Sequence, residues 1–199
     1  LANGIMINGV QIIVGGEVEV GFSEVYKLDY NGNSWVLLGN MAEKRSQFAV
    51  AELNGGVWAM GGFASDSWSA MQISTEIIYT DGTILDGPDL PGARARHCAV
   101  TLPNGKVVIM GGRTGDQHFV STSKDVLIYD PSTSTYTSGP DMFDERENFA
   151  CVTFNSDKHE GRTVILSAGG NSLSKAEIYD YDNGIWEQSK LFLSQLKYR

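Results

Sequence analysis

Short runs of alternating apolar and polar residues fill this chain, and turn signals separate them about every 8 to 12 residues. The alternation has a period of two, and no stretch shows the 3.6-residue period of an amphipathic helix. Tight hairpins are indicated by the Asn-Gly pairs at 8–9, 54–55 and 104–105, because these residues accept positive φ angles. A fourth connection, 155–162, is longer and polar. The pattern predicts an all-β protein.

A double glycine closes an apolar strand four times, with first glycines at 15, 61, 111 and 169. The intervals of 46, 50 and 58 residues are in the range of a propeller blade, whereas helical repeats are shorter. Each unit contains four short strands, which predicts four-stranded blades repeated radially. The glycines are expected to be structural, because no phosphate-loop lysine follows them. They are Gly15, Gly16, Gly61, Gly62, Gly111, Gly112, Gly169 and Gly170.

Other residues recur in register with the glycines. A large apolar or aromatic residue stands ten positions before an arginine in three units, as Trp35 and Arg45, Ile84 and Arg94, and Tyr136 and Arg146. A tyrosine column precedes this position by seven residues in 129–136 and 179–186. Because glycine has no Cβ, another group can approach its backbone closely. We expect the tyrosine and tryptophan columns to pack over that gap.

These columns resemble the kelch repeat, most clearly in the segments "IMGG...VLIYDPSTSTYTSGPDMFDER" and "LSAGG...AEIYDYDNGIW". The resemblance covers essentially all 199 residues and implies a kelch-type β-propeller of four four-stranded antiparallel blades. The repeats run approximately over 1–43, 44–92, 93–144 and 145–199. Departures are local: Leu28 stands in the tyrosine column, Ile84 stands in the tryptophan column, and no Asp follows Tyr79.

The chain begins and ends at nearly the same point of the repeat. Kelch propellers usually have more than four blades, commonly six, so the resemblance favours an incomplete ring whose outer faces await further blades. The alternative is a closed ring of four blades.

Composition narrows the class of partner. The net charge of −9 argues against nucleic acid, because phosphate binding needs clustered Lys and Arg. No apolar run is long enough for a membrane span, and the first residues show no signal-like segment. A soluble β protein that binds a protein or peptide is the expectation.

Cys98 and Cys151 fall in neighbouring columns of the aligned repeats. Alternate strand positions face opposite sides, so we expect no disulfide between them and interpret both as small buried side chains. Together with the absence of an Asn-x-Ser/Thr site, this favours an intracellular, cytoplasmic location.

Catalytic and metal-binding patterns are missing from the sequence. His97, His118 and His159 lie in three segments without Cys, Asp or Glu at metal-ligand spacing, so no metal and no cofactor is expected. The residues that copper radical oxidases of kelch type require are not present, and no Gly-x-Ser-x-Gly motif occurs. We expect a protein that is not an enzyme; the alternative is a carbohydrate-active or isomerase propeller with a pore-face site.

The loops are the expected place of function, because a rigid scaffold presents them. In the kelch family the loops after the double glycines and those entering each blade open on one face, where a partner binds. Arginines there suit an acidic peptide, and exposed aromatic residues supply contact area. The alternative is that the arginine column ties neighbouring loops together. The candidate partner-binding residues are Arg45, Arg94, Arg96, Arg146, Trp68, Arg113, Gln117, His118 and Phe119.

Kelch domains commonly serve as substrate receptors of cullin-based ubiquitin ligases. Such receptors carry a BTB region and a linking helical region upstream, and neither occurs in these 199 residues. We therefore expect an interaction module that could be the substrate-recognition part of a larger protein.

Overall fold

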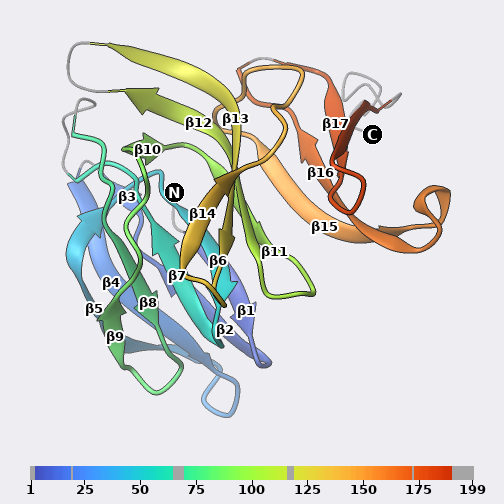
Figure 1. The fold of residues 1–199 in the computed structure, drawn as a ribbon. Helices are drawn as coiled ribbons and strands as arrows, with labels where there is room; N and C mark the ends of the chain where they lie inside the picture. Colours follow the sequence, from blue (N-terminus) through green and yellow to red (C-terminus); the bar gives the residue numbers. More distant parts are fainter. Residues whose placement is uncertain (1–2, 19, 65–69, 116–118, 172, 190–199) are drawn as a thin grey trace, which may run out of the picture. The chain divides into compact units, whose positions relative to one another are not determined.

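The computed structural model describes residues 3–18, 20–64, 70–115, 119–171 and 173–189. These residues form four antiparallel β-sheets, called blades 1 to 4 below, and one 3-10 turn, η1 (Asp157–His159) (Figure 1). The chain divides into two compact units, 1–95 with 114–121 and 96–113 with 122–199. The all-β class and the four-bladed organisation predicted from the sequence are confirmed.

Blades 1 and 2 lie in the first unit. In blade 1 the strand order is β1-β2-β4-β3, with β5 paired to β4; in blade 2 it is β6-β7-β8-β9. The strands are β1 (Asn3–Ile7), β2 (Val10–Val14), β3 (Glu17–Val18), β4 (Val20–Asp29), β5 (Ser34–Arg45), β6 (Ala49–Leu53), β7 (Gly56–Met60), β8 (Thr75–Ile78) and β9 (Ile84–Asp86).

Blade 3 has the strand order β10-β12-β13-β14, with β11 paired to β12, and blade 4 has the order β15-β16-β17-β18. The strands are β10 (Arg94–Ala95), β11 (Cys98–Thr101), β12 (Val107–Gly115), β13 (Val120–Asp130), β14 (Thr135–Ser138), β15 (Ala150–Ser156), β16 (Arg162–Ala168), β17 (Ala176–Asp180) and β18 (Ile185–Gln188).

Two of the three Asn-Gly hairpins have the expected backbone. Both residues have positive φ in 8–9 and 54–55. In 104–105 only Gly105 does, with φ +81°, and the side chain of Asn104 accepts a hydrogen bond from the backbone N–H of Lys106 at 3.1 Å. That side-chain bond builds an Asx turn, so the connection from β11 to β12 is longer than a two-residue hairpin.

Each unit has a core between the facing sheets of its two blades. In the first unit, Ile12 and Val25 of blade 1 pack with Ile78 of blade 2. In the second, Met110 of blade 3 packs with Tyr179 and Trp186 of blade 4, whose rings stack with their centroids 4.9 Å apart. The blades therefore bury their sheet faces against each other, as radial packing requires.

The tyrosine column is displaced by one residue in blade 2. Tyr179 pairs with Trp186 in blade 4, and the corresponding pair in blade 2 is Ile78 with Ile84. Ile78 is fully buried in the core of the first unit. The assignment of Tyr79 to this column was therefore wrong, because an aliphatic residue fills the position and the tyrosine follows it.

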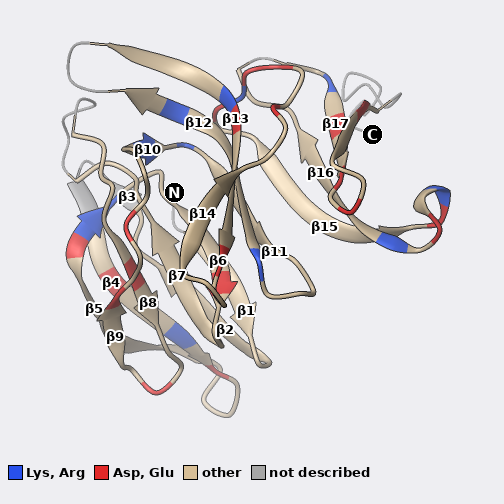
Figure 2. Ribbon diagram, viewed as in Figure 1, with Lys and Arg blue, Asp and Glu red and all other residues tan. Residues whose placement is uncertain are grey.

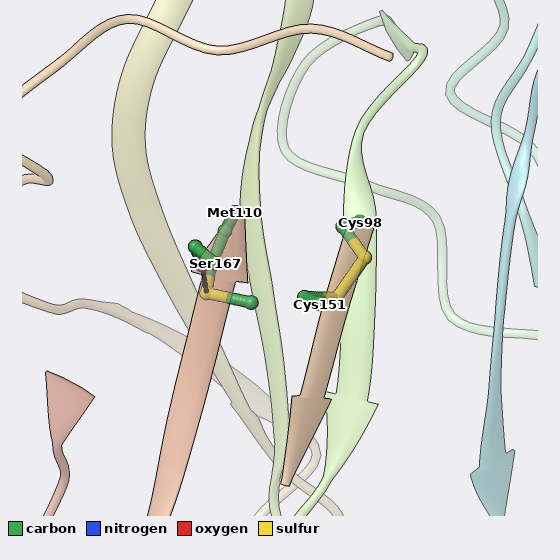
Figure 3. The surroundings of a disulfide bond; sticks show 4 residues. All are labelled: Cys98, Met110, Cys151 and Ser167. Carbon is green, nitrogen blue, oxygen red and sulfur yellow. Dashed lines mark hydrogen bonds between the residues drawn. A yellow bond between two sulfur atoms is a disulfide. The ribbon is translucent and has the colours of Figure 1, made fainter. Parts of the chain in front are cut away.

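Cys98 and Cys151 form a disulfide, contrary to the expectation from their columns (Figure 3). Their Cα atoms lie 6.0 Å apart, on β11 of blade 3 and β15 of blade 4. Side chains that face opposite sides of their own sheets meet when the two sheets are neighbours, so the alternation favours this pair. Beside it, the Ser167 hydroxyl donates to the Met110 sulfur at 3.7 Å. Because disulfides persist in oxidising compartments, the cysteines no longer support a cytoplasmic location.

The double glycines accommodate the backbone of the next blade. A Cβ on Gly61 would lie 2.3 Å from the carbonyl oxygen of Arg94, and one on Gly111 would lie 2.6 Å from that of Arg146. Both glycines have positive φ, +59° and +55°. The nearest atoms to these glycines come from the arginine carbonyls and from side chains such as Leu90 and Met142, so the expectation that the tyrosine and tryptophan columns fill the gap was wrong.

Candidate partner-binding site

The segment that enters each blade lies against the double glycine of the blade before it. The N–H of Gly62 donates to the carbonyl of Arg94 at 2.9 Å, and the N–H of Gly112 donates to that of Arg146 at 2.7 Å. Within each unit, the entry segment and the end of the glycine strand are therefore hydrogen-bonded neighbours. We call the part of a blade where its glycine strand ends, together with the entry segment bonded to it, the glycine end; Arg94 and Arg146 lie there.

Arg45 is fully buried and holds both ends of the loop that follows Gly62. Its Nη1 donates to the carbonyl oxygens of Gly61 at 3.0 Å and Ser74 at 2.7 Å. Its Nη2 lies 3.1 Å from Glu76 Oε1. Burial lowers the pKa of Arg45 from its ordinary value, and the Glu76 carboxylate opposes this shift by favouring the charged guanidinium.

Arg146 repeats this arrangement in blade 4. Its Nη1 donates to the carbonyl oxygens of Gly169 at 2.6 Å and Lys175 at 3.1 Å. Its Nε and Nη2 bind Glu177 Oε1 at 3.0 and 2.7 Å. The Glu177 carboxylate also accepts the backbone N–H groups of 143–144, so the pair fastens the entry segment and both loop ends together.

We call each of these pairs, Arg45 with Glu76 and Arg146 with Glu177, a loop clamp. Buried charges need a partner and further hydrogen bonds to offset the loss of hydration, and both clamps supply these. The guanidinium groups are turned into the protein, which fits the alternative that the arginine column ties loops together. Arg94 is also buried, at 4% exposure.

Arg96 is more accessible and has a different environment. Its φ is +56°, and its carbonyl accepts the N–H of Asn148 at 3.0 Å. Its Nη1 lies 3.1 Å from Glu147 Oε1, with side-chain exposures of 13% and 15%. Two contacts with the entry segment of blade 4 thus fix the position of Arg96 while part of its side chain stays accessible.

Arg113 and Phe119 lie on the excursion that follows Gly112. This stretch is a β-hairpin rather than the expected loop, because β12 continues through the double glycine to Gly115 and β13 begins at Val120. Phe119 is 83% exposed. Arg113 is half-buried and makes no ion pair within the described ranges. Trp68, Gln117 and His118 lie outside the described residues.

Charges of both signs are spread over the strands and loops (Figure 2). The chain is acidic overall, with a net charge of −9, yet four of its arginines stand in the entry segments and a fifth follows Gly112. Among these arginines, Arg96 and Arg113 are the two that are only partly buried, so a carboxylate could reach them.

Sequence reasoning missed the two glutamates of the loop clamps. Glu76 follows Arg45 by 31 residues, and Glu177 follows Arg146 by the same interval. That constant spacing, together with the position of each glutamate at a strand start, is the signal that would have identified them. They position loops and do not themselves reach solvent.

No group of three or more His, Cys, Asp or Glu side chains in the described part of the chain could hold a metal ion. The buried His159 shares a hydrogen bond with the Ser156 hydroxyl at 2.8 Å, beside η1. His97 is buried as well, as its strand column predicts. Across the same residues, no helix is long and apolar enough to cross a membrane.

Comparison with known proteins finds a kelch motif in this chain and similarity to kelch-repeat proteins. The kelch motif model matches residues 94–143. Kelch-like protein 15 of Danio rerio is 31% identical over 133 residues, which are 63% of this chain and 21% of that protein. A kelch repeat-containing protein of Caenorhabditis elegans is 32% identical over 104 residues, 50% of this chain and 17% of that protein.

A plant protein is similar at the same level. An F-box/kelch-repeat protein of Arabidopsis thaliana is 30% identical over 116 residues, which are 55% of this chain and 30% of that protein. The matched region is thus a minor part of each relative, about a fifth of the Danio rerio protein.

Proposed function

Because the chain belongs to the kelch-repeat family, we propose that it is a protein-interaction module that holds a partner segment at the glycine end of its blades. The observation that best supports this proposal is the loop clamp. A single buried guanidinium bonds both ends of the loop after the double glycine, in blade 2 through Arg45 and in blade 4 through Arg146.

The clamps favour a binding role because they make the loop ends part of the rigid scaffold. Loop ends that are already held in place reduce the conformational entropy that is lost when a partner binds. The loop contents remain free to vary between the fixed ends, which is how repeat folds present binding residues.

The accessible side chains at the glycine end indicate which kind of partner could bind there. Guanidinium groups can bind carboxylates in a bidentate manner, and Arg113 offers one; Arg96, whose Nη1 contacts Glu147, offers the accessible part of its side chain. Phe119 offers a large apolar surface at the tip of the β12–β13 hairpin, with 83% of its area exposed. We infer from the arginines that the partner is an acidic peptide segment.

We further propose that this region serves as the substrate-recognition part of a larger protein, such as a cullin-based ubiquitin ligase adaptor. Supporting this, one relative is named as combining kelch repeats with an F-box. We propose no catalytic role, since the names of the relatives describe repeats and not a reaction.

Peptide selection tests the proposal. A random peptide library is selected on the wild-type protein, and the affinity of the selected peptides is measured by fluorescence polarisation. We expect Asp- and Glu-rich sequences, and we expect Arg96→Ala with Arg113→Ala to weaken their binding at least about tenfold, because charge-assisted hydrogen bonds contribute about 1.5–3 kcal/mol each.

The control is Arg162→Ala with Lys158→Ala, which also removes two positive charges, in η1 and at the start of β16, whereas the double glycine follows the end of that strand. It should leave affinity unchanged. Selection that returns no acidic sequences, or an equal loss of affinity in the control, would contradict the proposal.

A further inference from the structure

Most of the net negative charge of this chain lies in one of its two units. The first unit contains four Lys and Arg residues against twelve Asp and Glu residues, whereas the second contains eleven against twelve. Eight of the nine net negative charges therefore belong to the first unit. A surface with an excess of one charge attracts partners of the opposite charge, so a site for a cation is to be sought in this unit.

A pocket in the first unit collects several of these acidic side chains. It lies beside the loop clamp of Arg45 and Glu76 and has a volume of about 400 Å³. Its walls are the end of β5, the start of β8, and the end of β9 with the segment that follows it. These walls contribute the carboxylates of Glu43, Asp86 and Asp89. The pocket is thus built by neighbouring blades of one unit.

Hydrogen bonds hold the walls of this pocket in place. Glu76 accepts the backbone N–H of Ala42 at 2.7 Å, which joins the end of β5 to β8. The N–H of Gly87 donates to the carbonyl of Thr75 at 2.9 Å, and the Thr75 hydroxyl donates to the carbonyl of Pro88 at 3.1 Å. The pocket is therefore formed before a ligand enters, which lowers the entropy cost of binding.

Three carboxylates in the pocket are available to a ligand. Glu43, Asp86 and Asp89 are exposed and, within the described ranges, make no ion pair and no side-chain hydrogen bond. The Arg45 guanidinium in the lining is already paired with Glu76. No group of three or more His, Cys, Asp or Glu side chains in the described residues could hold a metal ion. A larger cation with several hydrogen-bond donors fits carboxylates that line a pocket of this size.

The Nε of Arg45 supplies a second, independent sign of a ligand. This nitrogen is buried and has no hydrogen-bond partner among the described residues, and its side chain lines the pocket. In the other loop clamp the corresponding Nε of Arg146 donates to Glu177 at 3.0 Å. A buried donor without an acceptor is costly, and a ligand that brings an oxygen atom removes that cost. The clamp of blade 2 therefore keeps a donor that the clamp of blade 4 has already used.

We propose that this pocket binds an arginine residue of a partner protein. Its guanidinium group lies among Glu43, Asp86 and Asp89, and a peptide carbonyl of the same segment accepts the N–H of Arg45 Nε. Arginine suits the pocket because its planar guanidinium has five donors and can bond carboxylates on more than one side.

This site is separate from the proposed site for an acidic peptide. Arg96 and Arg113 belong to the second unit, whereas every residue that lines the pocket belongs to the first. The two sites bind groups of opposite charge, so either proposal can fail while the other holds.

NMR titration with N-acetyl-arginine amide tests the proposal, because this probe has both the guanidinium group and peptide carbonyls. We expect saturable shifts of the backbone amides of 43–45, 74–76 and 86–89 in the wild-type protein, and weaker binding as sodium chloride is added. N-acetyl-citrulline amide has nearly the same shape without the charge, and should bind at least about tenfold more weakly. n-Butylguanidine has the cation without a carbonyl, and should also bind more weakly.

A pair of double variants with equal net charge locates the site. Asp86→Asn with Asp89→Asn should weaken the binding of N-acetyl-arginine amide at least about tenfold, because charge-assisted hydrogen bonds are lost. The control, Asp29→Asn with Asp81→Asn, removes the same charge at the end of β4 and in the turn between β8 and β9. Asparagine keeps the oxygen that accepts the N–H of Asn31 or Thr83 there, so affinity should be unchanged.

Circular dichroism melting of each variant checks that its blades are folded, and we expect this because Asp86 and Asp89 are exposed. The proposal is overturned if the arginine probe causes no saturable shift at the three segments. Equal affinity for the citrulline probe or for n-butylguanidine overturns it as well, as does an equal loss of affinity in the two double variants.

Discussion

Nη2 of Arg146 lies 2.7 Å from Oε1 of Glu177, and neither side chain is accessible to solvent. A buried ion pair is a modest source of stability as a whole, yet removing one partner leaves the other charge buried without compensation. We expect Glu177→Ala to lower the free energy of unfolding by about 3–5 kcal/mol, measured by urea denaturation.

Two further variants sharpen the test of the clamp. Lys124→Ala breaks the half-exposed pair with Asp141, and should cost less than about 1 kcal/mol. Arg146→Met combined with Glu177→Leu should cost less than Glu177→Ala alone, since neither fully buried charge of the clamp is left without the other; Asp144, which also lies 3.6 Å from Arg146 Nη2, is 27% exposed. A Glu177→Ala variant as stable as the Lys124→Ala variant would show that the clamp carries little stability.

Gly61 and Gly55 both have positive φ, so alanine strains the backbone at either position by about 1–2 kcal/mol. A Cβ on Gly55 meets nothing within 4 Å, whereas one on Gly61 would lie 2.3 Å from the carbonyl oxygen of Arg94. We expect Gly61→Ala to cost about 1–3 kcal/mol more than Gly55→Ala, because the entry segment of blade 3 must shift. Equal melting temperatures of the two variants would contradict the close contact.

The Cys98–Cys151 disulfide joins residues 53 positions apart. A cross-link of that span restricts the unfolded chain and contributes about 4 kcal/mol in the chain-entropy model. We therefore expect dithiothreitol to lower the melting temperature, and Cys98→Ser with Cys151→Ser to melt at the lower temperature whether or not reductant is present. Rapid alkylation of two thiols in the folded protein without reductant would show that the bond is absent.

Hydrogen bonds from Ser132, followed by the contact with Lys106, lower the pKa of Asp130 from 3.8 to about 2. A depressed carboxyl pKa favours the folded state above the ordinary pKa, and this contribution disappears as the pH falls through about 2. An NMR titration of the Asp130 carboxyl carbon should show the low value, and Ser132→Ala should raise it. A midpoint near 3.8 in the wild type would contradict the hydrogen-bonded turn.

The sequence was sufficient for the architecture because the repeat imposes one pattern on four units. Glycine spacing predicted four blades, since a Cβ at Gly61 or Gly111 would collide with the next blade. Residue identity alone was less reliable within the repeat. Tyr79 looks like a member of the tyrosine column, but Ile78 fills that place because the core accepts any well-packed apolar side chain.

The relations between blades were harder to infer. The disulfide was missed because alternation was applied within one sheet, while Cys98 and Cys151 face each other across two. The burial of Arg45 and Arg146 was left open because a sequence does not reveal which arginines have a buried carboxylate nearby. The partner-binding roles of Arg96, Arg113 and Phe119 stay predictions.

The two loop clamps have the same anchor points around loops of different length. Arg45 bonds the carbonyls on either side of 62–73, and Arg146 bonds those on either side of 170–174. The entropy cost of closing a loop rises only slowly with its length. The loop between the two bonded carbonyl groups should therefore tolerate insertions and changes of sequence. We therefore expect that a new peptide sequence can be grafted between the two carbonyl groups that each arginine bonds. A new binding specificity could then be engineered without redesign of the blade.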